Sequence, residues 1–242
     1  MIRAQPQTSL LIFLAAMVAS LAALMLLPPI PQPQSYHQFA DGNTIFGIPN
    51  FWNVVSNLPF VIIGAIGLMR YRDDAATVFI FGGIFLTGFG SAYYHWHPDD
   101  GTLFWDRLPM ALAFSAILAK VVGERIDERA GAILLWPLLA LGVFSLLWWR
   151  WTDDLRLYGW VQFFPCLTLP VLFVLFPPKY TGTGYWLAAA ALYALAKVLE
   201  YKDDAIYAAG EILSGHTLKH LAAAAACYFI LRYFQTRKPI VR

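Results

Sequence analysis

The sequence predicts an all-α fold, a polytopic transmembrane helical bundle with a seven-helix core and an extra N-terminal transmembrane helix. Hydrophobic residues make up 59% of the 242 residues and charged residues only 13%, whereas a soluble domain carries about a quarter charged residues. Eight runs have the length and apolarity that a membrane-spanning helix needs, without the short alternating pattern of barrel strands. These runs are 9–29, 52–70, 75–95, 103–122, 131–149, 157–176, 184–202 and 214–234.

The first run has two interpretations, a retained helix or a cleaved signal peptide. One Arg precedes it, its apolar stretch exceeds a typical signal-peptide core, and no clear cleavage site follows, which favours retention. We therefore expect residues 1–35 to form a transmembrane helix with a Pro-rich linker and residues 36–242 to form the seven-helix core. The linker PPIPQPQ at 28–34 should be extended and stiff.

The other seven runs follow one another through short loops, and the loop charges predict their orientation. Eleven Lys and Arg residues flank the runs at the end shared by both termini, while Arg150, Arg156 and Lys202 flank the opposite end. Because basic loops stay on the cytoplasmic side, both termini should be cytoplasmic, in the inner membrane if the protein is bacterial. The balance of 17 basic and 15 acidic residues argues against a nucleic-acid partner. The sequence carries no signal for an oligomeric state.

Polar residues gather near the predicted outer ends of four of these runs. Polar groups at membrane depth are costly, and by default they indicate function. The runs bring Asn53, Ser56, Asn57, Ser91, His95, Asp106, Arg107, His216 and His220 to similar depth on one membrane face.

His216 and His220 are four residues apart, so they lie one turn apart on the same helix face. Two imidazoles at this spacing bind one metal ion in the zincin motif. A third His from a facing helix would give a zinc site with one position open for water, which is the catalytic arrangement. Such pairs also occur as surface or interfacial residues, and His95 alone could be an interfacial aromatic.

Other polar residues have structural interpretations. Asp106 stands beside aromatic residues at a helix start, so a salt bridge to Arg107 or a helix-dipole contact is the alternative to a chemical role. His97 should be solvated, and His37 should lie at the rim. Lys197 and Glu200 should pair within their helix, and Lys219 should extend outward to the membrane surface.

These residues stand in motifs that resemble the alkaline ceramidase family, within the CREST group of seven-helix membrane hydrolases that includes adiponectin-type receptors. The resemblance covers the core from about residue 50 to the C-terminus, and the very short loops suggest a bacterial member. It rests on FWNVVSNLPF at 51–60, GSAYYH at 90–95, WDRLPM at 105–110 and GHTLKH at 215–220.

The resemblance implies that His95, His216 and His220 hold a catalytic Zn²⁺ and that Ser91 and Asp106 act beside it. It places Asn53, Ser56 and Asn57 in the first family motif. The implied reaction is hydrolysis of the N-acyl amide of a ceramide-like lipid substrate to a fatty acid and a sphingoid base or other lipid amine.

Two departures from the family pattern concern ligands. Eukaryotic members carry an acid-rich segment that binds Ca²⁺ before the first core helix, but here Asp41 is the only acid in that stretch and Asn50 precedes the motif. This departure puts Ca²⁺ binding in question. The acid usual after Asp106 is replaced by Arg107, which alters what the headgroup pocket accepts.

Two other functions compete with hydrolysis. A non-catalytic, receptor-like lipid-binding protein would use the same architecture with a structural zinc. A haem or metal-transport protein would use membrane histidines differently, because bis-His haem needs histidines on opposite faces of the porphyrin.

Overall fold

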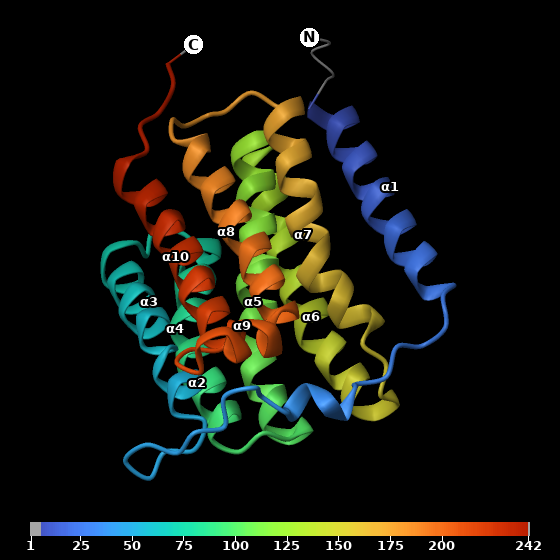
Figure 1. Cartoon of the computed structure of the whole chain (residues 1–242). Helices are drawn as coiled ribbons and strands as arrows, with labels where there is room; N and C mark the ends of the chain where they lie inside the picture. Colours follow the sequence, from blue (N-terminus) through green and yellow to red (C-terminus); the bar gives the residue numbers. More distant parts are fainter. Residues whose placement is uncertain (1–5, 242) are drawn as a thin grey trace.

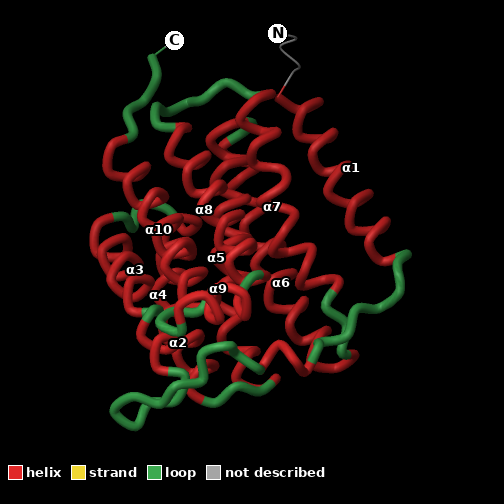
Figure 2. Tube along the Cα trace, viewed as in Figure 1, coloured by secondary structure: helices red, strands yellow, loops and turns green. Residues whose placement is uncertain are grey.

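The computed structural model describes residues 6–241, and those residues form helices and loops without strands (Figure 2). They pack into one bundle (Figure 1), which confirms the predicted all-α polytopic fold. The long helices are α1 (Pro6–Met25), α3 (Leu58–Arg70), α4 (Ala75–Trp96), α5 (Asp100–Arg125), α6 (Glu128–Thr152), α7 (Arg156–Leu175), α8 (Thr183–Tyr201) and α10 (Gly215–Thr236). The short helices are η1 (Gln34–His37), α2 (Phe51–Val55) and α9 (Asp203–Gly210).

Six stretches of the described residues are long and apolar enough to cross a membrane, counting α2 and α3 together as Phe51–Arg70. Helices α1, α4, α5, α6 and α7 supply the others, so the chain is a multi-pass membrane protein. The sequence predicts eight spans. Helices α8 and α10 have the expected length but are less apolar, because α8 carries Lys197 and Glu200, and α10 carries His216, Lys219 and His220.

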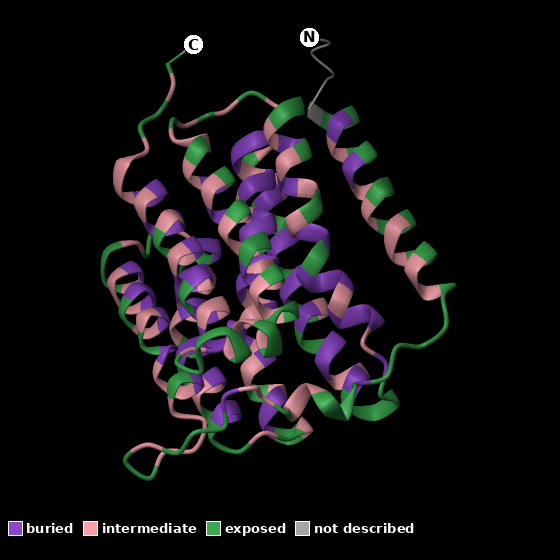
Figure 3. Cartoon of the chain, in the orientation of Figure 1, coloured by how far each residue is buried: buried purple, intermediate pink, exposed green. Residues whose placement is uncertain are grey.

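Helix α5 lies in the middle of the bundle against α4, α6 and α7 (Figure 1). It is the most buried of the candidate spans, whereas α1 at the edge is the least buried (Figure 3). Helices α4 and α5 approach closely at Gly90, where a Cβ would overlap the carbonyl oxygen of Trp105. This contact places the polar ends of α4 and α5 side by side.

The second predicted run is one span interrupted at Ser56 and Asn57, between α2 and α3. The reason is Pro59, which has no N–H and whose ring clashes with a carbonyl one turn earlier. The carbonyl oxygen of Asn53 accepts hydrogen bonds from Asn57 Nδ2 (2.8 Å) and Ser56 Oγ (3.2 Å) instead. The interruption therefore fixes the side chains of Asn53, Ser56 and Asn57 at one end of the bundle.

The first helix ends earlier than the run 9–29 predicts, because Leu27 precedes Pro28 and the residue before a proline is disfavoured in a helix. The Pro-rich linker then crosses to the turn between α6 and α7. The backbone N–H of Leu155 donates to Ile30 O (2.8 Å), and Arg156 donates to the carbonyl oxygens of Met25 and Leu27. Helix α1 begins and helix α10 ends at the same end of the bundle (Figure 1), opposite the segments 31–51 and 203–213. The boundary at residue 35 and the cytoplasmic side of the termini stay predictions.

Candidate metal centre

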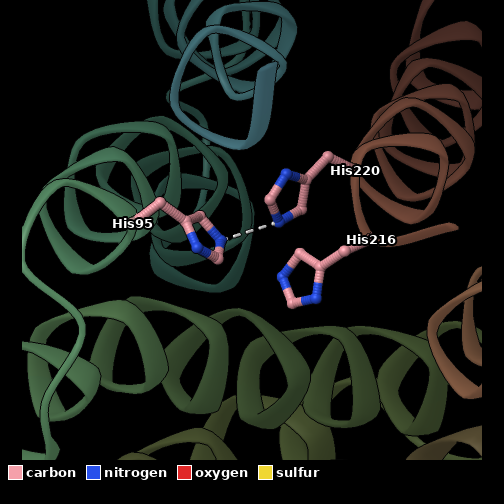
Figure 4. Close-up of side chains that lie close together, drawn as sticks. All are labelled: His95, His216 and His220. Atoms are coloured by element: carbon pink, nitrogen blue, oxygen red, sulfur yellow. Dashed lines mark hydrogen bonds between the residues drawn. The ribbon is translucent and has the colours of Figure 1, made fainter. Parts of the chain in front are cut away.

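Three histidines from α4 and α10 converge in the interior. His95, His216 and His220 are 0%, 4% and 6% exposed, and one ring nitrogen of each lies within 4.8 Å of the others. The Nε2 atoms of His95 and His220 are 3.1 Å apart, and the His216 ring faces both (Figure 4). The sequence predicted this set from the four-residue spacing and the family motifs, and the fold brings its members together.

The donor set fits a metal ion. A tetrahedral zinc with bonds of about 2.0–2.1 Å separates two imidazole nitrogens by about 3.3–3.4 Å, close to the observed 3.1 Å. Among the described residues, the buried Nε2 atom of His216 has no hydrogen-bond partner. Unpaired buried polar atoms are rare in folded proteins. The group can therefore hold a metal ion of a kind that prefers imidazole, such as zinc.

Ser56 orients one of these rings. Its hydroxyl donates to the carbonyl oxygen of Asn53, so its lone pairs are free to accept from His220 Nδ1 at 2.8 Å. A proton on Nδ1 leaves the Nε2 lone pair of His220 for a metal. This is the way in which outer partners fix the tautomer of a metal-binding histidine.

The start of α10 is fixed by capping and by a link to α2. Ser214 caps the helix, accepting from Thr217 N at 3.1 Å. The Asn53 side chain accepts from Thr217 Oγ1 (2.7 Å) and donates to Asp41 O (3.3 Å). Asn50 donates to the carbonyl oxygen of His95 at 2.8 Å. Asn53 of the first motif thus links α2 to α10, and Asn50, which precedes that motif, links the same segment to the end of α4.

Two contacts with this centre were not predicted. The Phe39 ring lies edge-on to both His95 and His216, with ring centroids 4.7 Å apart in each case. Asp203 accepts from the backbone N–H of His216 at 2.6 Å. Phe39 lies on the loop before α2 and Asp203 begins the short helix α9, so neither spacing nor hydropathy could have indicated these contacts.

A cavity of about 720 Å³ reaches the histidine centre at His220, and we call it the central cavity. Ser91, Asp106 and His220 line it together with Asn57. Its wall is predominantly apolar, and α7, α8 and α10 supply much of it, including Phe164, Leu169, Trp186, Ala189 and Ile230. The arrangement places polar groups beside a space suited to a hydrocarbon chain.

Asp106 and Arg107 also line the central cavity but form no ion pair with each other among the described residues. The salt-bridge alternative for Asp106 is therefore wrong. The prediction that Lys219 extends outward is also wrong, because its Nζ lies 2.6 Å from Glu200 Oε1 beside the cavity. The neighbouring helix α8 supplies the Glu200 carboxylate, which is 17% exposed. The predicted pair of Lys197 and Glu200 is present at 2.7 Å.

The two remaining histidines lie outside the centre. His97 is exposed at the end of α4, as predicted. His37 is at the rim, where its ring contacts Tyr94 OH at 3.0 Å and Asp100 Oδ1 at 3.1 Å. Its ring links η1 to α4 and α5, so His37 has a structural role that the sequence did not indicate.

A family model described as ceramidase matches residues 44–178, which is more than half of the chain. The chain belongs to the ceramidase family. It is therefore a ceramidase-like hydrolase embedded in a membrane, for which the family implies a lipid substrate. No curated protein matches the chain.

The matched segment contains the first motif, His95 and Asp106, but it stops before α10. The expected resemblance extends to the C-terminus, and the match is shorter. His216 and His220 lie outside it, yet the fold places them against the matched His95. The histidine centre thus contains one residue from the matched segment and two residues from α10, which follows it.

Proposed function

We propose that this protein is a zinc-dependent hydrolase that cleaves the N-acyl amide of a ceramide-like lipid, releasing a fatty acid and a sphingoid base or other lipid amine. One observation carries the proposal: three buried imidazoles converge, and one of them, His220, lines an apolar cavity. His95, His216 and His220 would hold the zinc. Bound zinc would polarise the amide carbonyl and lower the pKa of its water to about 7.

The chain's own residues supply the proton transfers and the positioning. Asp106 takes the proton of the attacking water as the C–O bond forms, and it gives a proton to the amine nitrogen as the C–N bond breaks. Its place on the cavity wall, with no ion pair to any residue that the structure describes, supports this role. Ser91, buried on α4 and also on the wall, donates a hydrogen bond to the developing oxyanion.

The apolar wall accommodates the acyl chain. The amide then lies near the end of the bundle opposite the termini, where the interrupted α2–α3 span and the start of α10 meet. With both termini cytoplasmic, this end is the outer membrane face. Asn53, Ser56 and Asn57 position the centre rather than contact the reacting atoms.

The proposal is tested by measuring bound zinc and fatty-acid release from a panel of N-acyl lipids. The wild type is compared with the double variant His216→Ala/His220→Ala. His97→Ala is the matched control, since it removes an exposed imidazole two residues from His95. We expect the double variant to lose zinc and activity and the control to keep both.

Three outcomes would contradict parts of the proposal. Equal zinc content in the wild type and the double variant would refute the metal centre. A zinc-loaded wild type without activity on any lipid amide would refute the hydrolase and leave the receptor-like alternative. A Soret absorption band in the purified protein would favour a haem protein.

A further inference from the structure

Arg107 is a buried cation that forms no ion pair with any acid of the described residues. It is 7% exposed, and its Nη1 atom has no hydrogen-bond partner within residues 6–241. Its guanidinium carbon lies 5.5, 4.8 and 5.0 Å from the ring centroids of Tyr36, Trp149 and Tyr158. These rings hold the group in place by cation–π contact. Ring faces do not replace the oxygen acceptors that guanidinium N–H groups need, and a buried donor without an acceptor is costly.

The charges around the central cavity also leave an excess of positive charge. Glu200 is shared by Lys197 and Lys219, at 2.7 and 2.6 Å. Asp106 is the other carboxylate on the wall. Ionised, these two acids face three cations, Arg107 included. Arg156 also lines the cavity, but it forms an ion pair with Asp154. A metal ion at the histidines would add further positive charge.

We propose that Arg107 binds an acidic group on the amine part of the substrate, so that the preferred lipid is an N-acyl amine bearing a carboxylate, phosphate or sulfonate. The inference rests on the proposed function. A planar guanidinium pairs with such oxyanions through two parallel N–H donors. Arg107 directly follows Asp106 and lies on the same cavity wall, whereas the apolar wall takes the acyl chain. The acidic group therefore sits beyond the amide, on the amine side.

The test compares two substrates that differ in one group. These are N-dodecanoylglycine and its neutral counterpart N-dodecanoylglycinamide, assayed by release of dodecanoate from the zinc-loaded full-length protein in a neutral detergent. A hydrogen bond to a charged group contributes enough to change kcat/KM by about ten- to a hundredfold. We expect the wild type to prefer the acidic substrate by that factor.

Variants assign the preference to Arg107. Arg107→Gln should lower the ratio of the two kcat/KM values to near one. Arg107→Lys keeps the charge without the paired donors and should keep part of the ratio. Arg150→Gln is the matched control, because Arg150 is exposed at the end of α6 and does not line the cavity. It should keep the wild-type ratio. Thermal unfolding verifies that each variant is folded. If Arg107→Gln is not folded, the comparison of Arg107→Lys with the wild type tests the inference instead.

Other outcomes would overturn the inference. A wild-type ratio near one, or the same ratio in Arg107→Gln, refutes an acidic substrate. The released fatty acid also has a carboxylate; if Arg107→Gln only relieves inhibition by dodecanoate, Arg107 binds product instead.

A binding measurement separates this inference from the proposed hydrolysis. If neither substrate is cleaved, calorimetric binding of dodecyl phosphate and of dodecanol tests whether Arg107 binds an acidic group. If dodecyl phosphate binds more tightly than dodecanol and this difference depends on Arg107, the binding site for an acidic group is supported although the proposed hydrolysis is refuted. Equal binding in the wild type and Arg107→Gln refutes the site.

Discussion

Replacing Ser56 with Ala tests whether a single hydroxyl sets the protonation of the metal centre. Ser56 is buried, its O–H donates to Asn53 O, and its oxygen accepts from His220 Nδ1 at 2.8 Å. Without the hydroxyl, a proton on His220 Nδ1 has no acceptor. The ring then loses its preference for the tautomer with a free Nε2, the atom that lies 3.1 Å from His95 Nε2.

The expected magnitude follows from that one hydrogen bond. Leaving a buried donor without an acceptor costs about 1–3 kcal/mol, and 1.4 kcal/mol corresponds to a factor of ten in an equilibrium constant. Ser56→Ala should therefore weaken zinc binding by about ten- to a hundredfold, which agrees with the usual effect of removing an outer partner of a metal-binding histidine. Ser56→Thr keeps the hydroxyl and should restore most of the affinity.

Zinc affinity is measured by competition with a chromophoric chelator at constant pH. Ser145→Ala is the control, because Ser145 is a fully buried serine on α6 whose hydroxyl donates to Gly142 O and touches no histidine. Its zinc affinity should equal that of the wild type. If Ser56→Ala is folded and binds zinc within twofold of the wild type, the hydroxyl does not set the tautomer and the argument fails.

Three further predictions concern other parts of the chain. Asp106→Asn should lower kcat by about a hundredfold to ten-thousandfold with unchanged zinc content, and a smaller loss would remove Asp106 as the proton carrier. Gly215→Ala should lower both the Tm and the zinc content, since its Cβ would overlap Leu199 O, whereas Gly184→Ala, with free space around it, should alter neither. Hydrogen bonds from Arg156 hold the pKa of Asp154 below its usual range, so the carboxylate stabilises the fold above the usual carboxyl pKa of about 3.9. The Tm deficit of Asp154→Asn should accordingly be constant near neutral pH and shrink below about pH 4; a deficit that grows in acid would contradict this assignment.

The sequence predicted the parts of the centre that depend on helix periodicity and membrane depth. Apolar runs located the spans, and a four-residue spacing placed two histidines on one face of α10. The proximity of His216 and His220 to His95 could be predicted because all three residues lie at the same end of their spans. What the sequence could not show were contacts made through loops, such as the Phe39 ring against His95 and His216. Such contacts depend on the path of the segment before α2, which carries no periodic signal.

Lys219 shows why a charge on a membrane helix cannot be placed from its own helix. A lysine near the end of a span has two ways to avoid lipid, extending to the surface or meeting a buried acid. The second requires a partner on a neighbouring helix at the same height, and here Glu200 on α8 supplies it. The same two helices are the ones whose hydropathy falls below that of the other spans. Low apolarity in α8 and α10 thus has a physical cause: their polar residues line the central cavity and the metal centre inside the bundle.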